Sequence, residues 1–278
     1  MPGRPQQHDI LERIARAKRA ELQKLRAAVP QSALEKQVTR RSAGAFRNAL
    51  IERRAGQPDC AVIAEVKKAS PSRGVICADY DPVRFARGYE RAGARAVSVL
   101  TDKEFFQGSL DHLRQVKEAV SLPVLRKDFT LDEYHVYEAA SAGADAILLI
   151  VAILQPKEIS DLLGVSKSLG LDALVEVHTA AELQIALEAG AEIIGVNNRN
   201  LKTFEVSLKT SLDLIDSISD RCVAVSESGL RTAADLERLR TAGFDAFLIG
   251  ERLMAERDPG AALHNLLHGV SARTATPN

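Results

Sequence analysis

The fold of this chain is decided by a repeated stretch, which reads SAGADAILLI at residues 141–150. An Ala-Gly pair is followed there by a run of apolar residues. Glycine ends many helices because it accepts the left-handed backbone conformation at low cost. A continuous apolar run of this length is typical of a strand that is buried on both faces of a parallel sheet. The stretch therefore predicts the end of a helix followed by a buried strand.

The same pattern occurs four times along the chain. It reads RAGARAVSVL at 91–100, SAGADAILLI at 141–150, EAGAEIIGV at 188–196 and TAGFDAFLI at 241–249, and the Ala-Gly pairs begin at 92, 142, 189 and 242. This spacing is twice the length of one strand–helix unit. The intervening strands are predicted at 61–67, 123–127, 172–177 and 222–226. Eight strands result.

Helices are predicted to alternate with these strands. Asp81-Pro82 opens the first, since proline is favoured at the first helical position. The others are predicted near 109–120, 132–142, 156–169, 179–189, 208–217, 231–242 and 258–268. Eight strands alternating with eight helices predict an α/β fold, the (β/α)8 TIM barrel. A doubly wound sheet also alternates, but the glycine-rich dinucleotide turn typical after its first strand is missing from this sequence.

The segment before the first strand predicts a helical extension of the barrel. Residues 7–28 place apolar side chains on one stripe of a helix, and no strand pattern precedes residue 61. Residues 1–54 hold 13 Lys and Arg against 5 Asp and Glu, although the whole chain has no net charge. Such a segment can bind nucleic acid, but its basic residues are spread through amphipathic helices with few aromatics. A solvated face that rests against an acidic body is favoured, so we expect no nucleic-acid partner.

Composition indicates a soluble globular protein. No apolar run approaches the length that spans a bilayer, and the N-terminus shows no signal-peptide pattern, so we expect no membrane partner. Cys60, Cys77 and Cys222 have no paired spacing. This favours a reducing, cytoplasmic location without a disulfide framework or a cysteine metal site.

Charged residues follow the predicted strands at their carboxyl ends, which is where a TIM barrel carries its active site. Glu65 and Lys67 lie two apart, so they share one face of the first strand. Unlike charges on an inward face cost free energy unless they pair or meet a charged ligand. The convergent set contains two lysines, three glutamates and one asparagine: Glu65, Lys67, Lys127, Glu176, Asn197 and Glu227. The alternative is a set of ion pairs that merely closes the barrel.

The last two strands predict a phosphate site. Ser228-Gly229 and Gly250-Glu251 stand where such barrels bind a phosphate on backbone N–H groups at a helix start. Glycine lets the backbone approach the ligand closely. We therefore expect a phosphorylated small-molecule substrate, and a simple tight turn at Gly250 is the alternative.

Six motifs together resemble indole-3-glycerol-phosphate synthases. They are AEVK with SPS at 64–67 and 70–72, LRKDF at 125–129, DAILLIVAIL at 145–154, EVH at 176–178, GVNNRNLKTF at 195–204 and SESG at 226–229. The similarity runs from the first helix to the last strand. It implies ring closure of 1-(2-carboxyphenylamino)-1-deoxyribulose 5-phosphate, with loss of CO2 and water, to indole-3-glycerol phosphate in tryptophan biosynthesis. It also implies that no metal or organic cofactor is needed.

The resemblance implies a role for each polar residue. Lys127 would be the general acid that protonates the ketone oxygen, and Lys67 would hold the substrate carboxylate. Glu176 would act as the base or stabilise a cationic intermediate, and Glu65 would orient Lys67. Three further residues would position substrate groups: Asn197, Arg199 and Glu227. His178 is expected to be a bystander or a supporting residue.

The resemblance also implies an apolar slot for the flat ring and a cup for the phosphate. The slot residues are Pro71, Phe106, Phe129 and Leu201. The phosphate residues are Ser70, Ser228, Gly229, Gly250 and Glu251. Glu251 departs from the Ser of some family members, so that only its backbone N–H could serve the phosphate. Simple core packing is the alternative for Phe106 and Phe129.

The resemblance implies that residues 1–56 cover the barrel mouth and that residues 57–278 form the barrel, as one functional domain. The chain ends at Asn278, so we expect none of the second, fused barrel of some relatives. We expect a monomer or a weak homodimer. Two other functions remain open: another phosphate-binding barrel of amino-acid biosynthesis, and a non-catalytic barrel that binds a phosphorylated ligand.

Overall fold

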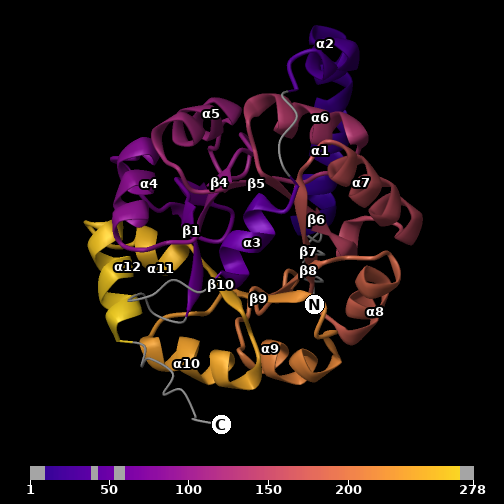
Figure 1. Cartoon of the computed structure of the whole chain (residues 1–278). Coiled ribbons are helices and arrows are strands. Elements are labelled where there is room, and N and C mark those ends of the chain that lie inside the picture. The colour runs from indigo at the N-terminus through magenta and orange to yellow at the C-terminus, as the bar shows by residue number, and fades with distance from the viewer. Residues whose placement is uncertain (1–9, 39–42, 53–59, 270–278) are drawn as a thin grey trace, which may run out of the picture.

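A closed barrel of eight parallel strands forms the centre of the computed structural model, which describes residues 10–38, 43–52 and 60–269 (Figure 1). Neighbouring strands follow one another in chain order, and the barrel closes where β1 pairs with β10. The strands are β1 (Ala61–Val66), β4 (Ala96–Leu100), β5 (Val124–Lys127), β6 (Ala146–Ile150), β7 (Asp172–Val177), β8 (Ile193–Asn197), β9 (Val223–Glu227) and β10 (Ala246–Ile249). The predicted (β/α)8 TIM barrel is confirmed.

Helices surround the barrel, as Figure 1 shows. They are α4 (Pro82–Arg91), α5 (Leu110–Ala119), α6 (Glu133–Ala142), α7 (Pro156–Ser168), α8 (Ala180–Glu188), α9 (Lys209–Leu214), α10 (Ala233–Ala242) and α12 (Pro259–His268). The helix predicted over 208–217 changes its winding at its end, where α9 gives way to the 3-10 turn η2 (Ile215–Ser217). The sequence did not predict four short elements: the hairpin of β2 (Ala69–Ser70) and β3 (Gly74–Val75), η1 (Val151–Ile153) and α11 (Glu251–Met254).

The repeated Ala-Gly pairs end helices as predicted. Gly93, Gly143, Gly190 and Gly243 all have positive φ angles, between 86° and 122°. In the repeat at 141–150, the N–H of Gly143 donates to carbonyls of the last turn of α6, which satisfies groups that the helix end leaves unpaired. The chain then reverses into β6, whose residues are all buried.

Side chains of the strands alternate between two apolar clusters. Val62, Ala64 and Val66 of β1 face the helices, whereas Ala61 and Ile63 belong to the cluster inside the barrel. Glu65 takes the next inward position. The same alternation follows Leu125 with Lys127, Leu174 with Glu176 and Val225 with Glu227. The inner cluster therefore ends in a layer of charged groups at the carboxyl ends of the strands.

The N-terminal extension contacts both ends of the barrel. It contains α1 (Ile10–Ala28), α2 (Gln31–Glu35) and α3 (Ala45–Ile51). In Figure 1, α3 lies in the centre of the ring of strands. Its Arg47 N–H donates to Asp172 Oδ2 at 2.9 Å, and Asp172 begins β7. Helix α3 therefore closes the amino-terminal end of the barrel rather than its mouth. The expected boundary between residues 56 and 57 lies outside the described residues.

Helix α1 lies at the opposite end, over the mouth. Its Leu11 and Ile14 pack in the same inner cluster as Phe129 and Ile150. Lys18 is buried, and its Nζ lies 3.1 Å from Asp102 and 3.0 Å from Asp128, which follow β4 and β5. Burial by itself would lower the pKa of Lys18, but the two carboxylates raise it well above its ordinary value. Charge pairing thus fixes α1 to the carboxyl ends of two strands.

Within the described residues, no helix is long and apolar enough to cross a membrane.

Replacing the buried ring of α3 should cost much of the stability of the fold. Phe46 is fully buried at the amino-terminal end of the barrel. We expect Phe46→Ala to lower the free energy of unfolding by about 3–5 kcal/mol, because it removes apolar contacts and leaves a cavity. Urea unfolding measures this loss. Ile51→Ala, on the same helix but exposed, is the control and should change stability by only about 0.5 kcal/mol. Equal losses in both variants would show that α3 does not seal the barrel.

Candidate active site

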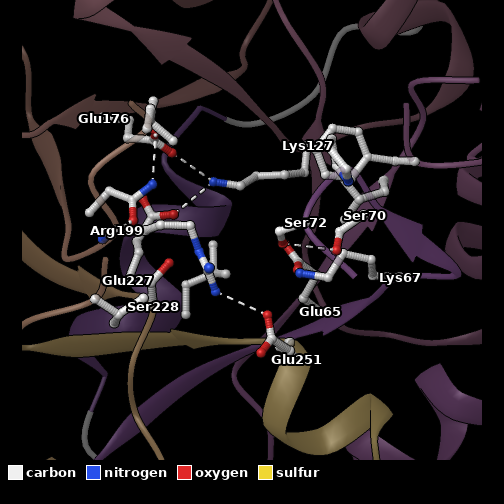
Figure 2. A pocket seen from close by; sticks show the side chains of 18 of the residues that line it. Glu65, Lys67, Ser70, Ser72, Lys127, Glu176, Arg199, Glu227, Ser228 and Glu251 are labelled. Carbon is white, nitrogen blue, oxygen red and sulfur yellow. Dashed lines mark hydrogen bonds and ion pairs between the residues drawn. The ribbon is translucent and has the colours of Figure 1, made fainter. Parts of the chain in front are cut away.

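One cavity at the carboxyl ends of the strands brings all the predicted site residues together. It has a volume of about 400 Å³ and lies beneath α1. Figure 2 shows side chains that converge on it from several strands and loops. Each predicted site residue lines this cavity: Glu65, Lys67, Ser70, Pro71, Phe106, Lys127, Phe129, Glu176, Asn197, Arg199, Leu201, Glu227, Ser228, Gly229, Gly250 and Glu251.

Lys127 occupies the centre of the polar wall. Its Nζ donates to Glu176 Oε2 at 2.9 Å and to Glu227 Oε2 at 2.7 Å, as the dashed lines of Figure 2 mark. Burial by itself would lower the pKa of Lys127, but the Glu176 and Glu227 carboxylates raise it well above its ordinary value. Lys127 therefore stands as an ammonium group inside the cavity.

The two carboxyl partners of Lys127 differ in charge. Burial opposes ionisation of Glu176, but Lys127 and His178 together hold the pKa of Glu176 below its ordinary value. Burial raises the pKa of Glu227 to about 7. The positive charge of Lys127 lowers this pKa, and the negative charge of Glu176 raises it. Glu176 is thus ionised, whereas Glu227 can carry a proton near neutral pH. Different protonation states suit the two carboxyls to different tasks.

Glu65 and Lys67 form the ion pair that their spacing predicts. Lys67 Nζ donates to Glu65 Oε1 at 2.7 Å, and Ser98 Oγ lies 3.4 Å from the other oxygen of Glu65. Gly250 leaves the room for this pair. A Cβ at position 250 would lie 2.3 Å from Glu65 Oε1. The φ angle of Gly250 is −125°, so the close approach, and not the backbone conformation, requires glycine there.

The end of the cavity that follows β9 and β10 is lined by two turns and by ionic contacts. Ser228 and Gly229 both have positive φ angles, 66° and 81°, in the turn after β9. Glu251 is the first residue of α11, and its carboxylate lies 3.0 Å from Arg199 and 2.8 Å from Arg73. Sequence analysis missed Arg73. No strand or helix pattern marks it, because only the β2–β3 hairpin brings it across the cavity.

The apolar side of the cavity combines barrel loops with α1. The rings of Phe106 and Phe129 lie 6.2 Å apart between their centroids. Ile10, Leu11 and Ile14 complete this wall. The sequence placed Ile10 and Ile14 on one helical stripe but could not show that the stripe faces the site.

Comparisons with known proteins point to one family. A model of the family described as "Indole-3-glycerol phosphate synthase" matches residues 11–266. The indole-3-glycerol phosphate synthase of Chlorobium luteolum is 50% identical over 262 residues, covering 94% of this chain and 99% of that protein. The enzyme of the same name from Polaromonas sp. is 49% identical over 263 residues, covering 93% and 98%. This chain belongs to the indole-3-glycerol phosphate synthase family.

Family membership identifies the reaction. The chain is a carboxy-lyase of tryptophan biosynthesis that forms indole-3-glycerol phosphate, as the motifs implied. A phosphorylated small-molecule substrate agrees with the family. Solved structures with low sequence identity share only the fold. A 3-hexulose-6-phosphate synthase has a TM-score of 0.62 at 15% identity, covering 76% of this chain and 100% of that one.

A buried ionic network adjoins the end of β5, the strand that carries Lys127. Asp128 follows Lys127 and pairs with Lys18 at 3.0 Å and with Arg126 at 3.3 Å. Burial by itself would raise the pKa of Asp128, but Arg126 and Lys18 hold it well below its ordinary value. His135 lies beside this network, and its Nδ1 accepts the N–H of Leu131. Burial and the nearby Arg126 lower the pKa of His135 to about 3.

Among the described residues, no group of three or more His, Cys, Asp or Glu side chains is arranged to hold a metal ion.

His135 should make the fold sensitive to acid. Its pKa is lower in the folded chain, so the unfolded chain binds the extra proton between pH 6.5 and about 3, and stability falls as the pH falls through that window. When the pH is lowered from 7 to 5, the free energy of unfolding of His135→Asn should decrease by about 2 kcal/mol less than that of the wild-type protein. Urea unfolding at both pH values tests this. The same change at exposed His264 is the control, and an equal acid loss in all three proteins would refute the assignment.

Gly250→Ala should damage the Glu65–Lys67 pair without unfolding the barrel. The added methyl group would collide with the Glu65 carboxylate, so Lys67 would lose its position. We expect kcat/KM to fall by about 10- to 100-fold, since small displacements of a positioned group are costly. Steady-state kinetics measures the fall. Gly164→Ala, where a Cβ meets nothing within 4 Å, is the control. Unchanged kinetics in Gly250→Ala would show that the pair does not depend on this contact.

Proposed function

We propose that Lys127 is the general acid of the ring closure, with Glu176 and Glu227 as its two partners. The observation that carries this proposal is the Lys127 ammonium group held between the two carboxyls at 2.9 and 2.7 Å. In the reaction, a ring carbon attacks a ketone, and the ketone oxygen gains negative charge as the bond forms. An ammonium group at that oxygen stabilises the charge and supplies the proton.

Glu176 is suited to the next stage of the reaction. Ring closure leaves a cationic, iminium-like intermediate before CO2 departs and the aromatic ring is restored. Glu176 is buried and ionised, so its charge acts in a site with little water to screen it. Its other oxygen accepts a hydrogen bond from Asn197 Nδ2 at 3.2 Å, which fixes its orientation. It stabilises this intermediate, whose aromatic ring is restored by loss of CO2, or acts as the base that takes the proton lost in the final dehydration.

Lys67 and Arg199 are suited to the substrate carboxylate, and Glu65 orients Lys67. Lys67 points its ammonium group into the cavity from its pair with Glu65. The planar fork of Arg199 can bind a carboxylate through two hydrogen bonds. Its backbone N–H donates to Asn197 Oδ1, which ties the loop of Arg199 to the end of β8.

The phosphate is assigned to the turns after β9 and β10, with Ser70 from the β2–β3 hairpin. Glu251 keeps only its backbone N–H for the phosphate, since its carboxylate pairs with Arg73 and Arg199. These arginines place positive charge beside the cup. The flat ring is assigned to the apolar slot: Pro71, Phe106, Phe129 and Leu201, with Ile10, Leu11 and Ile14 of α1.

We further propose that the chain acts in the cytoplasm as a monomer or a weak homodimer, without a nucleic-acid partner. The site residues above all come from one chain, which supports a site that is complete in a single copy. The three cysteines are free, which suits a reducing compartment. Residues 1–56 and the barrel over 57–278 form one functional domain, since α1 lines the cavity.

Lys127→Met should abolish turnover while the barrel persists. The change removes the ammonium group and keeps most of the apolar stem, so we expect kcat to fall by about 100-fold or more. The sequence has no Trp, so indole fluorescence of the product rises over a dark background when the carboxyphenylamino substrate is added. Lys157→Met, at an exposed lysine on α7, is the control and should retain full turnover. Turnover near normal in Lys127→Met would overturn the proposed role.

A further inference from the structure

A histidine connects the central carboxylate to the outside of the barrel. His178 lies one residue beyond β7, and its side chain is 12% exposed. Its Nδ1 lies 3.1 Å from Glu182 Oε2 on α8, and the same oxygen accepts the backbone N–H of His178 at 2.7 Å. Its Nε2 lies at ion-pair distance, 3.5 Å, from Glu176 Oε1 and has no hydrogen-bond partner in the described part of the chain. The imidazole therefore stands between two carboxylates.

This arrangement favours a protonated imidazole. A neutral ring has one N–H, so one of its nitrogens would present a lone pair to a carboxylate. The protonated ring presents an N–H to both. The charged groups that face it are Glu176 on β7, Glu182 on α8 and Glu227 on β9. Burial by itself would lower the pKa of His178, but the hydrogen bond to Glu182 and these charges raise it above its ordinary value.

A protonated His178 matters at the stage of the reaction at which Lys127 loses its charge. Glu176 is paired with the Lys127 ammonium before the reaction begins. When Lys127 passes its proton to the ketone oxygen, it becomes a neutral amine, and Glu176 loses that positive charge. A buried carboxylate without a cation tends to take up a proton. The cationic intermediate forms at this same stage and needs Glu176 to remain negative.

We propose that His178, held as a cation by Glu182, is a positioning residue that keeps Glu176 ionised after Lys127 has given up its proton. The proposal rests on the roles proposed above for Lys127 and Glu176. In this role, His178 acts through Glu176 and does not contact the substrate. It also gives Glu182, a residue outside the cavity, an influence on turnover.

Two substitutions test this inference. His178→Asn removes the cation, and we expect kcat to fall by about 10-fold with little change in KM, since one pKa unit at Glu176 corresponds to a factor of ten. Glu182→Gln keeps an oxygen for the backbone N–H of His178 but removes the negative charge. Because Glu182 stabilises the protonated ring, the alkaline fall of kcat should move to lower pH in Glu182→Gln. In His178→Asn, the part of this decrease in kcat that comes from deprotonation of His178 should be absent.

Glu188→Gln is the matched control, since it makes the same chemical change at an exposed position of α8. It should leave the pH profile of kcat unchanged. An unaltered kcat in His178→Asn, or a pH profile of Glu182→Gln identical to that of Glu188→Gln, would overturn the inference. A rise in KM alone would also overturn it, because that result indicates a structural role.

The outcome for Lys127→Met separates this inference from the proposed function. If Lys127→Met is inactive and the variants of His178 and Glu182 keep the normal kcat and pH profile, only the role of His178 fails. If Lys127→Met retains turnover, Lys127 is not the general acid. Glu176 then does not lose its first cation during the reaction, and the role proposed for His178 also fails.

Discussion

Side chains in a closed parallel barrel alternate between the interior and the helix layer, and the site of this protein depends on that constraint. The interior is apolar through Ile63, Leu125, Leu174 and Val225. The next inward position on each of these strands carries a charge. The alternation of the strands directs these charged side chains away from the helix layer, so they must pair with one another or with a ligand. Lys127, placed between Glu176 and Glu227, is the result.

The N-terminal extension shows how one short segment serves two ends of a barrel. Helix α3 seals the amino-terminal end with apolar packing around Phe46. Helix α1 lies over the mouth, where it supplies apolar side chains to the cavity and one buried cation to Asp102 and Asp128. The ionic contact is costly to form, because both charges leave water. The contact fixes the position of Asp128, the residue that follows Lys127.

Neighbouring charges and burial give two similar carboxyl groups of the site different pKa values. Glu176 and Glu227 share Lys127, yet the pKa of Glu176 lies below its ordinary value and that of Glu227 lies above it. His178 contributes to this difference, because it faces Glu176 more closely than any other cation except Lys127 among the contacts described. Glu251 shows another ionic arrangement in the cavity, in which its carboxylate pairs with both Arg73 and Arg199.

The sequence by itself determined the barrel and which residues at the strand ends meet in one cavity. The Ala-Gly repeat and the apolar runs are local signals, and the two-residue period of a strand selects the inward residues once the fold is known. Only the tertiary structure decided that Lys127 pairs with both Glu176 and Glu227, that α3 seals the far end, and that Arg73 and Glu251 meet. These contacts join residues far apart in the chain, and no local period records them. Gly250 makes the point clearly: its sequence position suggested a turn for phosphate, whereas the fold shows that it also makes room for Glu65.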